Sequence, residues 1–127
     1  MWLKRAVVAA ALLLCMGQFQ NATAQSLTSD DYLDYPPGYD ALFTCKGSMS
    51  YTGGHNVRVV AMAAFDHGEG TWGIGYPVDS GYQPDSAEAT SMWPLYHSNP
   101  GRYSCTVDYY LDGFYYTSIF LGWYIWT

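Results

Sequence analysis

Apolar and polar residues alternate most regularly in two stretches that each contain a cysteine. In residues 41–51, ALFTCKGSMSY, one face carries Phe43, Cys45, Gly47, Met49 and Tyr51. In residues 103–109 the corresponding set is Tyr103, Cys105, Val107 and Tyr109. A period of two is typical of half-buried β-strands. The pattern therefore predicts two strands whose cysteines point inward.

The second of these strands leads into a predicted hairpin. The letters LDG, residues 111–113, form a turn signal, and FYYTSIFLGWYIW, residues 114–126, follows as the partner strand. Both faces of this last strand are apolar or aromatic. The expected faces are Tyr115, Ile119, Leu121, Trp123 and Ile125 on one side, and Phe114, Tyr116, Phe120, Tyr124 and Trp126 on the other. Such a strand is either buried on both sides or forms a surface patch with a function.

Four further segments lie between the cysteine strands. VRVVAMAAF, residues 57–65, is almost wholly apolar and is bounded by turn signals, which favours a central strand over a short helix. TGGHN, residues 52–56, precedes it and predicts a hairpin, and TWGIGYPV, residues 71–78, predicts a short strand. Residues 79–100 contain three prolines and little periodicity. We expect them to form a long loop with at most short strands or one helical turn near residues 86–92, and such long loops are often functional.

The first 40 residues predict two segments outside the core. Residues 1–24 combine a cationic start, nine apolar residues and a polar tail ending in Ala-x-Ala, which is the pattern of a signal peptide cleaved after Ala24. Cys15 offers an alternative, a lipid anchor, but the residue before it is Leu14 where that processing needs a small one. Residues 25–40 are acidic and rich in Tyr and Pro, so we expect an arm that need not join the core, with the sandwich domain spanning 41–127.

Cleavage changes both the charge and the cysteine count. Removing 24 of 127 residues leaves 103, with three cations (Lys46, Arg58 and Arg102) against eleven carboxylates, a formal charge of −8. This charge argues against nucleic acid or an anionic membrane surface as partner. Two cysteines remain, and in an exported chain they predict one disulfide, Cys45–Cys105, rather than a catalytic thiol. We therefore expect a secreted, extracytoplasmic protein without a membrane span.

The motif NPGRYSC, residues 99–105, resembles the D-x-G-x-Y-x-C signature of the immunoglobulin fold, with Asn99 in place of Asp. The resemblance implies an antiparallel β-sandwich in which Cys45–Cys105 bridges the sheets and the Tyr103 hydroxyl bonds to nearby backbone, forming a tyrosine corner. That family also has a buried Trp on the strand after the first cysteine. Residues 57–65 contain none.

Candidate chemistry is sparse. Asp66, His67 and Glu69 lie together in DHGEG, and His97 is available from the long loop, but neither H-x-x-x-H nor C-x-x-C spacing occurs. Two opposed carboxylates for glycoside cleavage, such as Asp108 and Asp112, have no support beyond being acids. We therefore predict no enzyme, no metal and no cofactor.

The aromatic content favours a binding role. Thirteen Tyr and, after cleavage, four Trp exceed what one small core can enclose, and these residues are enriched at recognition surfaces. The expected ligand contacts are Tyr110, Tyr115 and Tyr116 near the LDG turn, together with Trp93 and Tyr96 from the long loop. The sequence thus predicts a binding module for a protein or glycan. Two alternatives stay open: a small acidic enzyme inhibitor, and a structural subunit that polymerises through its last strand.

Overall fold

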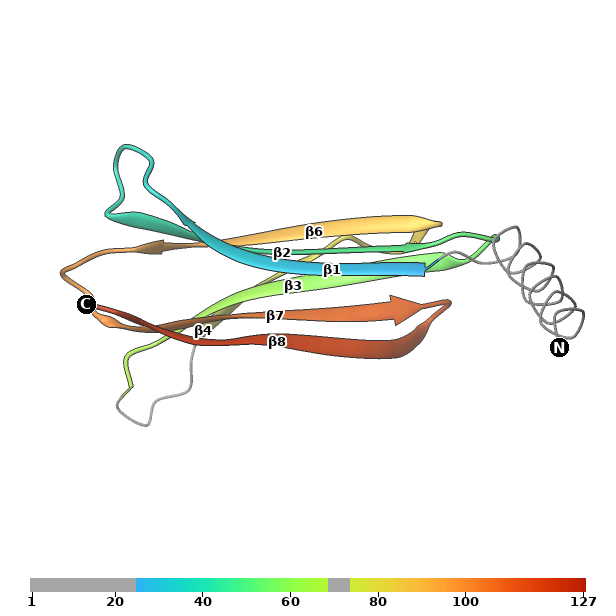
Figure 1. The fold of residues 1–127 in the computed structure, drawn as a ribbon. Coiled ribbons are helices and arrows are strands. Elements are labelled where there is room, and N and C mark those ends of the chain that lie inside the picture. The colour runs from blue at the N-terminus through green and yellow to red at the C-terminus, as the bar shows by residue number, and fades with distance from the viewer. Residues whose placement is uncertain (1–24, 69–73) are drawn as a thin grey trace, which may run out of the picture.

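The protein is a two-layer antiparallel β-sandwich (Figure 1). The structure is a computed structural model that describes residues 25–68 and 74–127. These residues form no helix, and their strands are β1 (Gln25–Asp34), β2 (Ala41–Tyr51), β3 (Asn56–Asp66), β4 (Ile74–Asp79), β5 (Gln83–Pro84), β6 (Ser86–Leu95), β7 (Gly101–Leu111) and β8 (Phe114–Trp126). The expected fold class, an all-β sandwich with one disulfide, is confirmed.

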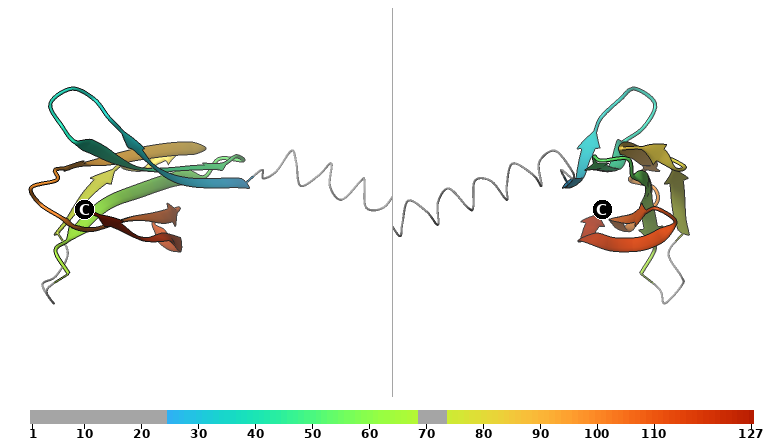
Figure 2. Two further views of the ribbon diagram at one scale, coloured as in Figure 1. Left: turned by 60° about the vertical axis from the view of Figure 1, so that its left-hand side comes forward. Right: turned by 90° about the vertical axis from the view of Figure 1, so that its right-hand side faces the viewer.

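One layer has the strand order β1-β2-β6, and the other has the order β4-β3-β7-β8, with the short β5 paired to β3. Figure 2 shows the two layers facing each other with the long connections at their ends. β3 is central, as its apolar sequence predicts, because it pairs with both β4 and β7. The hairpin expected at TGGHN is wrong, since β2 and β3 lie in different layers.

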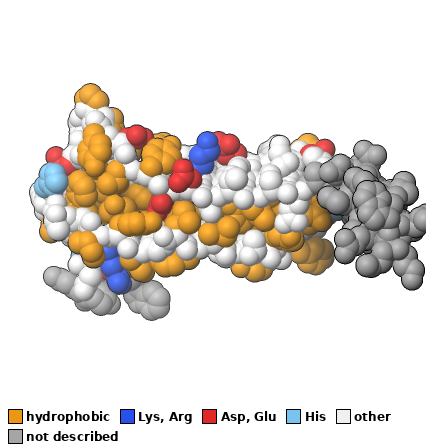
Figure 3. Space-filling view, viewed as in Figure 1, with side chains coloured by type: hydrophobic (Ala, Val, Ile, Leu, Met, Phe, Trp, Pro, Cys, Tyr) orange, Lys and Arg blue, Asp and Glu red, His pale blue; other side chains and the backbone are white. Residues whose placement is uncertain are grey.

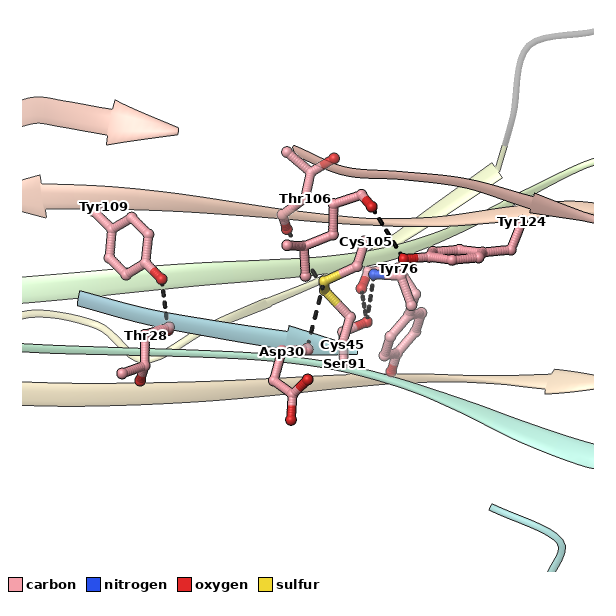
Figure 4. Close-up of a disulfide and its surroundings, with 11 residues drawn as sticks. Thr28, Asp30, Cys45, Tyr76, Ser91, Cys105, Thr106, Tyr109 and Tyr124 are labelled. Carbon is pink, nitrogen blue, oxygen red and sulfur yellow. Dashed lines mark hydrogen bonds between the residues drawn. A yellow bond between two sulfur atoms is a disulfide. The ribbon is translucent and has the colours of Figure 1, made fainter. Parts of the chain in front are cut away.

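The disulfide joins the two layers through their middle. Cys45 on β2 and Cys105 on β7 are bonded, with 5.2 Å between their Cα atoms, and neither is exposed (Figure 4). The inward alternation predicted for both strands is confirmed, because the expected core residues are buried, with Tyr51 at the end of β2 only partly so. Val57, Val59, Ala61 and Ala63 of β3 complete the centre of the core.

The hairpin predicted at LDG is also confirmed. β7 and β8 pair directly on either side of the turn, with Leu111 opposite Phe114. Asp112 and Gly113 both have positive φ angles, 51° and 89°. A two-residue turn of this kind matches the right-handed twist of the flanking strands, and Asp-Gly is among the pairs that tolerate it.

The expectation of an N-terminal arm outside the core is wrong for residues 25–34. These residues form β1 and pair along their whole length with β2. Leu27 and Leu33 pack against the core, whereas Asp30 and Asp34 face solvent. The alternation was hidden because the inward positions between the two leucines are Ser29 and Asp31. The described part of the sandwich therefore begins at residue 25 rather than 41.

The expectation of a long loop over residues 79–100 is also wrong, because residues 86–95 form β6. Its inward residues are too small to give a strong hydrophobic pattern; they are Ala87, Ala89, Ser91 and Leu95. Proline has no backbone N–H to donate. Pro94 is tolerated because β6 is an edge strand, on which some backbone N–H groups point away from the sheet and have no partner strand. Trp93 accordingly lies on a strand, and Tyr96 directly follows it.

The two faces expected for the last strand differ from the observed ones. Irregularities in the β7–β8 register occur opposite Ser104–Thr106 and Tyr109–Tyr110, and Gly122 has a φ of 101°. Each irregularity shifts the side-chain alternation. As a result Ile119, Leu121 and Trp126 pack against the core, and the outward residues are Tyr115, Phe120, Trp123 and Ile125.

In the described part of the chain, no helix is long and apolar enough to cross a membrane. The predicted signal peptide, residues 1–24, and Trp72 lie outside the described residues.

Candidate functional site

The predicted contact residues fall into two groups at opposite ends of the sandwich. Tyr110 and Tyr115 pair beside the LDG turn, where β7 ends. Tyr96 lies at the start of β7, because its carbonyl accepts a 2.9 Å hydrogen bond from Trp126 Nε1 and Trp126 pairs with Gly101. The 11 residues of β7 separate the two groups by roughly 30 Å at about 3.3 Å per residue. They cannot form one continuous site.

At the hairpin end, an arginine stacks on the aromatic pair. Arg58 lies 4.7 Å from the Tyr110 ring centre, and the Tyr110 and Tyr115 ring centres are 6.0 Å apart at 78°. Arg58 also donates to Asp79 Oδ1 over 2.9 Å, and this pairing lowers the pKa of Asp79. Tyr116 is on the inner side of the same end, where its hydroxyl accepts a hydrogen bond from Gln25. Tyr115 and Tyr116 are exposed, and Tyr110 is partly buried.

At the other end, an aromatic groove of about 390 Å³ lies between the edges of β4 and β6. Its lining residues are Tyr76, Met92, Trp93, Pro94, Tyr96 and Asn99. Two of them, Trp93 and Tyr96, are predicted contact residues. None of the six carries a charge, so the groove presents aromatic faces, a thioether, hydroxyls and one amide.

Packing beneath the groove fixes its two predicted rings. Trp93 is partly buried against the core and stacks on Phe65, with 6.3 Å between ring centres and 8° between planes. Tyr96 lies 6.1 Å from the ring centre of Tyr39. Its backbone is held by the bond from Trp126 and by a turn in which the Asn99 N–H donates to the Tyr96 carbonyl over 2.9 Å.

A buried serine holds the strands that flank the groove. Ser91 of β6 accepts a 3.1 Å hydrogen bond from the Ala63 N–H of β3, and its hydroxyl donates to the Tyr76 carbonyl of β4 (Figure 4). Ser91 therefore links the two layers on this side of the sandwich. Because these bonds position both edge strands before any ligand arrives, the groove is pre-formed.

Sequence reasoning missed Tyr76, Met92 and Asn99. Tyr76 was recognised only as part of a short strand, and Met92 and Asn99 lay in the expected loop. Their place in the groove depends on the adjacency of β4 and β6, which belong to different sheets. A local pattern carries no information about that adjacency.

The tyrosine corner differs from what the resemblance implies. Tyr103 is buried, and its ring packs on Phe43 and Tyr124, with ring centres 4.5 and 5.4 Å away. Among the described residues, the Tyr103 hydroxyl makes no hydrogen bond. The inward tyrosine that does bond to backbone is Tyr109, whose hydroxyl donates to the Thr28 carbonyl over 2.7 Å (Figure 4).

Within residues 25–68 and 74–127, no group of three or more His, Cys, Asp or Glu residues could hold a metal ion. Asp66 instead accepts hydrogen bonds from the Gly68 N–H and from Arg102, and these two contacts lower its pKa. His97 stacks on Trp126 at 4.7 Å, and its backbone N–H donates to Asp40 over 2.7 Å. Glu69 lies outside the described residues.

Comparison with known proteins gives little guidance. No family model matches the chain, and no curated protein is significantly similar to it in sequence. One similar solved structure is that of a Bordetella pertussis protein assigned as ApaA. It is 15% identical with a TM-score of 0.43, over 83% of this chain and 94% of that one. A likeness at this level establishes neither family nor function.

Proposed function

We propose that this protein is an extracytoplasmic binding module that holds its ligand in the groove between β4 and β6. The observation that carries the proposal is the pre-formed, uncharged aromatic lining of that groove. Binding sites are typically concave and mostly apolar, with a few polar groups that fix orientation. The disulfide and the leader-like first 24 residues support export.

The fold itself is proposed to be immunoglobulin-like. The strand order β1-β2-β6 facing β4-β3-β7-β8, with a bridge from β2 to β7, corresponds to the arrangement of that fold when β2 and β7 are taken as its cysteine strands. Two features differ, since the Tyr103 hydroxyl lacks its backbone bond and β3 has aliphatic residues where the family has a Trp.

A neutral sugar surface is the ligand class that suits the groove best. Trp93, Tyr96 and Tyr76 offer ring faces for the apolar side of a sugar, and Asn99 offers an amide for its hydroxyls. The absence of charge from the six lining residues disfavours an ionic ligand. An uncharged protein segment rich in Pro or aromatic residues is the second class.

The test is a glycan array followed by calorimetry on the bound glycans. Tyr76→Ala should weaken binding by roughly 30-fold, equivalent to the ~2 kcal/mol typical of an aromatic anchor. Tyr76 is suitable because its side chain is 60% exposed, so its removal should leave the fold intact. Trp93 is less suitable, because it also packs against the core.

Two variants serve as controls. Tyr35→Ala removes a ring that is 71% exposed and outside the groove, and Tyr115→Ala removes one at the hairpin end. Both should bind like the wild type. If no glycan binds, or if Tyr115→Ala loses binding while Tyr76→Ala keeps it, the groove is not the glycan site. A protein captured from the native secretome and lost with Tyr76→Ala would assign the second ligand class.

One observation favours a second candidate function, a subunit that polymerises through β8. This strand is 13 residues long, forms an edge of its sheet, and contains no charged residue. Figure 3 shows hydrophobic side chains along this side of the molecule. Long, uncharged edges readily pair with another strand.

Sedimentation velocity over a concentration series tests the second candidate. Polymerisation predicts self-association that falls by about tenfold or more in the double variant Phe114→Lys, Ile125→Lys, because charge on an edge opposes pairing. Both side chains are at least 75% exposed, so folding should survive. Tyr35→Lys is the matched control. A wild-type chain that stays monomeric throughout removes this candidate.

A further inference from the structure

The open side of the sandwich, opposite the groove, contains a pocket between the edge strands β1 and β8. Its volume is about 170 Å³, and its lining residues are Asp31, Tyr32, Leu33, Phe43, Tyr103 and Tyr124. Four of the six are aromatic and one is acidic. We refer to it as the seam pocket.

Asp31 points into the sandwich rather than into solvent. Its partner across the β1–β2 ladder is Cys45, and directly paired residues of an antiparallel sheet share a face. The Oδ2 atom of Asp31 is fully buried and has no hydrogen-bond donor among the described residues. Burial raises the pKa of Asp31, and the neighbouring Tyr124 hydroxyl opposes this effect. A buried carboxylate oxygen without a donor is costly.

The three cations of the described residues are all paired with other carboxylates. Lys46 lies 3.1 Å from Glu88, Arg58 is bonded to Asp79, and Arg102 lies 2.7 Å from Asp66. None of these three cations therefore neutralises the Asp31 carboxylate in the seam pocket. The Tyr124 hydroxyl interacts with the Asp31 carboxyl group, but no cation of the described residues does.

The rings around Asp31 also suit a cation. Tyr103 packs between Phe43 and Tyr124, so aromatic surface from both layers lines the pocket, which is open to solvent. Faces of aromatic rings attract cations, and the attraction grows when water is excluded. A volume of about 170 Å³ holds roughly five water-sized groups at about 30 Å³ each, enough for the end of an alkyl-ammonium or guanidinium chain.

We propose that the seam pocket is a binding site for an organic cation that carries N–H groups, with Asp31 as its acceptor and Tyr103 and Tyr124 as its walls. A carboxylate only accepts hydrogen bonds, so the site selects ammonium or guanidinium ions, which carry N–H donors, over quaternary ammonium ions, which carry none. The site is separate from the β4–β6 groove and does not depend on the function proposed for that groove.

The experiment is an NMR titration of the full chain, expressed with its own leader in an export-competent host. The probes are n-butylammonium and n-butylguanidinium, with tetramethylammonium as the cation that lacks N–H. We expect at least one N–H probe to cause saturable shifts of the Asp31, Tyr103 and Tyr124 amides, and tetramethylammonium to bind about tenfold more weakly or worse. No saturable shift with either N–H probe, or tighter binding of tetramethylammonium, would overturn the proposal.

Asp31→Asn should weaken binding by roughly ten- to hundredfold, the value of a charge-assisted hydrogen bond. Asp34→Asn is the matched control, since Asp34 is an exposed acid on the same strand, and it should bind like the wild type. Equal losses in both variants would mean nonspecific attraction to an acidic strand, and no loss in Asp31→Asn would exclude Asp31 as acceptor. Should Asp31→Asn fail to fold, the comparison of probes on the wild-type chain still decides the proposal.

Discussion

At the scale of single residues, Tyr103 and Tyr109 show what alternation can and cannot predict. Both are buried on the inward face of β7, as the sequence indicates. Only Tyr109 bonds to backbone, and its acceptor is Thr28, 81 residues away on β1. Alternation places a ring on a face, but the partner of its hydroxyl depends on a strand that the sequence did not reveal. The Tyr109 bond is long-range and is therefore not a tyrosine corner.

The two tyrosines should respond differently to loss of the hydroxyl. Tyr109→Phe removes the part-buried hydrogen bond to the Thr28 carbonyl and should lower the free energy of unfolding by about 1–2 kcal/mol. Tyr103→Phe removes a hydroxyl that has no partner among the described residues, so its cost should stay under about 0.5 kcal/mol. Urea denaturation of both variants measures the contrast. A larger loss for Tyr103→Phe would restore the corner assignment.

For the candidate site, too, some features could be predicted from the sequence and others could not. Trp93 and Tyr96 could be selected from the sequence because the surplus of aromatics has to be exposed somewhere. Their separation from Tyr110, Tyr115 and Tyr116 could not, because it depends on which end of a strand each residue occupies. Asp31 could not be selected either, since its inward direction follows only from the pairing of β1 with β2.

At the scale of strands, strong patterns gave correct elements and weak patterns did not. β2, β3, β7 and β8 have large or branched apolar residues at a regular spacing, and all four were predicted as strands. β1 and β6 were missed because Ser, Asp and Ala fill their inward positions, as at Asp31 and Ala89. These two strands still fold because each pairs along its length with β2. Neighbouring strands here override weak local preference.

The close approach of β2 to β7 beside the disulfide supports a prediction for Gly47. A Cβ atom on this glycine would lie 2.2 Å from Val107 Cγ1, so the layers would have to separate or distort. Gly47→Ala should therefore cost about 1–3 kcal/mol of stability, as overpacking does. Ser48→Ala, on the outward face of the same strand, should cost far less. Thermal unfolding of the oxidised proteins measures both, and equal effects would mean that the layers are not closely packed here.

At the scale of the whole molecule, this acidic chain contains carboxylates whose pKa is lowered by folding and carboxylates whose pKa is raised. Asp79 is stabilised in its charged form by Arg58, which lowers its pKa. Asp31 is destabilised in its charged form by burial, which raises its pKa. The first kind stabilises the fold when it is ionised, and the second when it is protonated. The two should therefore respond oppositely to pH.

Linkage fixes the sign of each response. The raised pKa of Asp31 gives stability that is fully present below the unfolded pKa of about 3.9 and is lost as pH rises through the folded pKa. The lowered pKa of Asp79 gives stability that is present above about 3.9 and is lost as pH falls through the folded pKa. As pH rises from 3 to 7, the free energy of unfolding of Asp31→Asn should increase relative to that of the wild type. That of Asp79→Asn should decrease relative to the wild type over the same range. Each tenfold difference between the folded and unfolded ionisation constants is worth about 1.4 kcal/mol in the buried limit, and less at the partly exposed Asp79. Urea denaturation at several pH values, without added amines, gives both curves. If the two stability differences changed with pH in the same direction, the folded protein would stabilise the Asp31 carboxylate by itself, and the case for a cation in the seam pocket would fail.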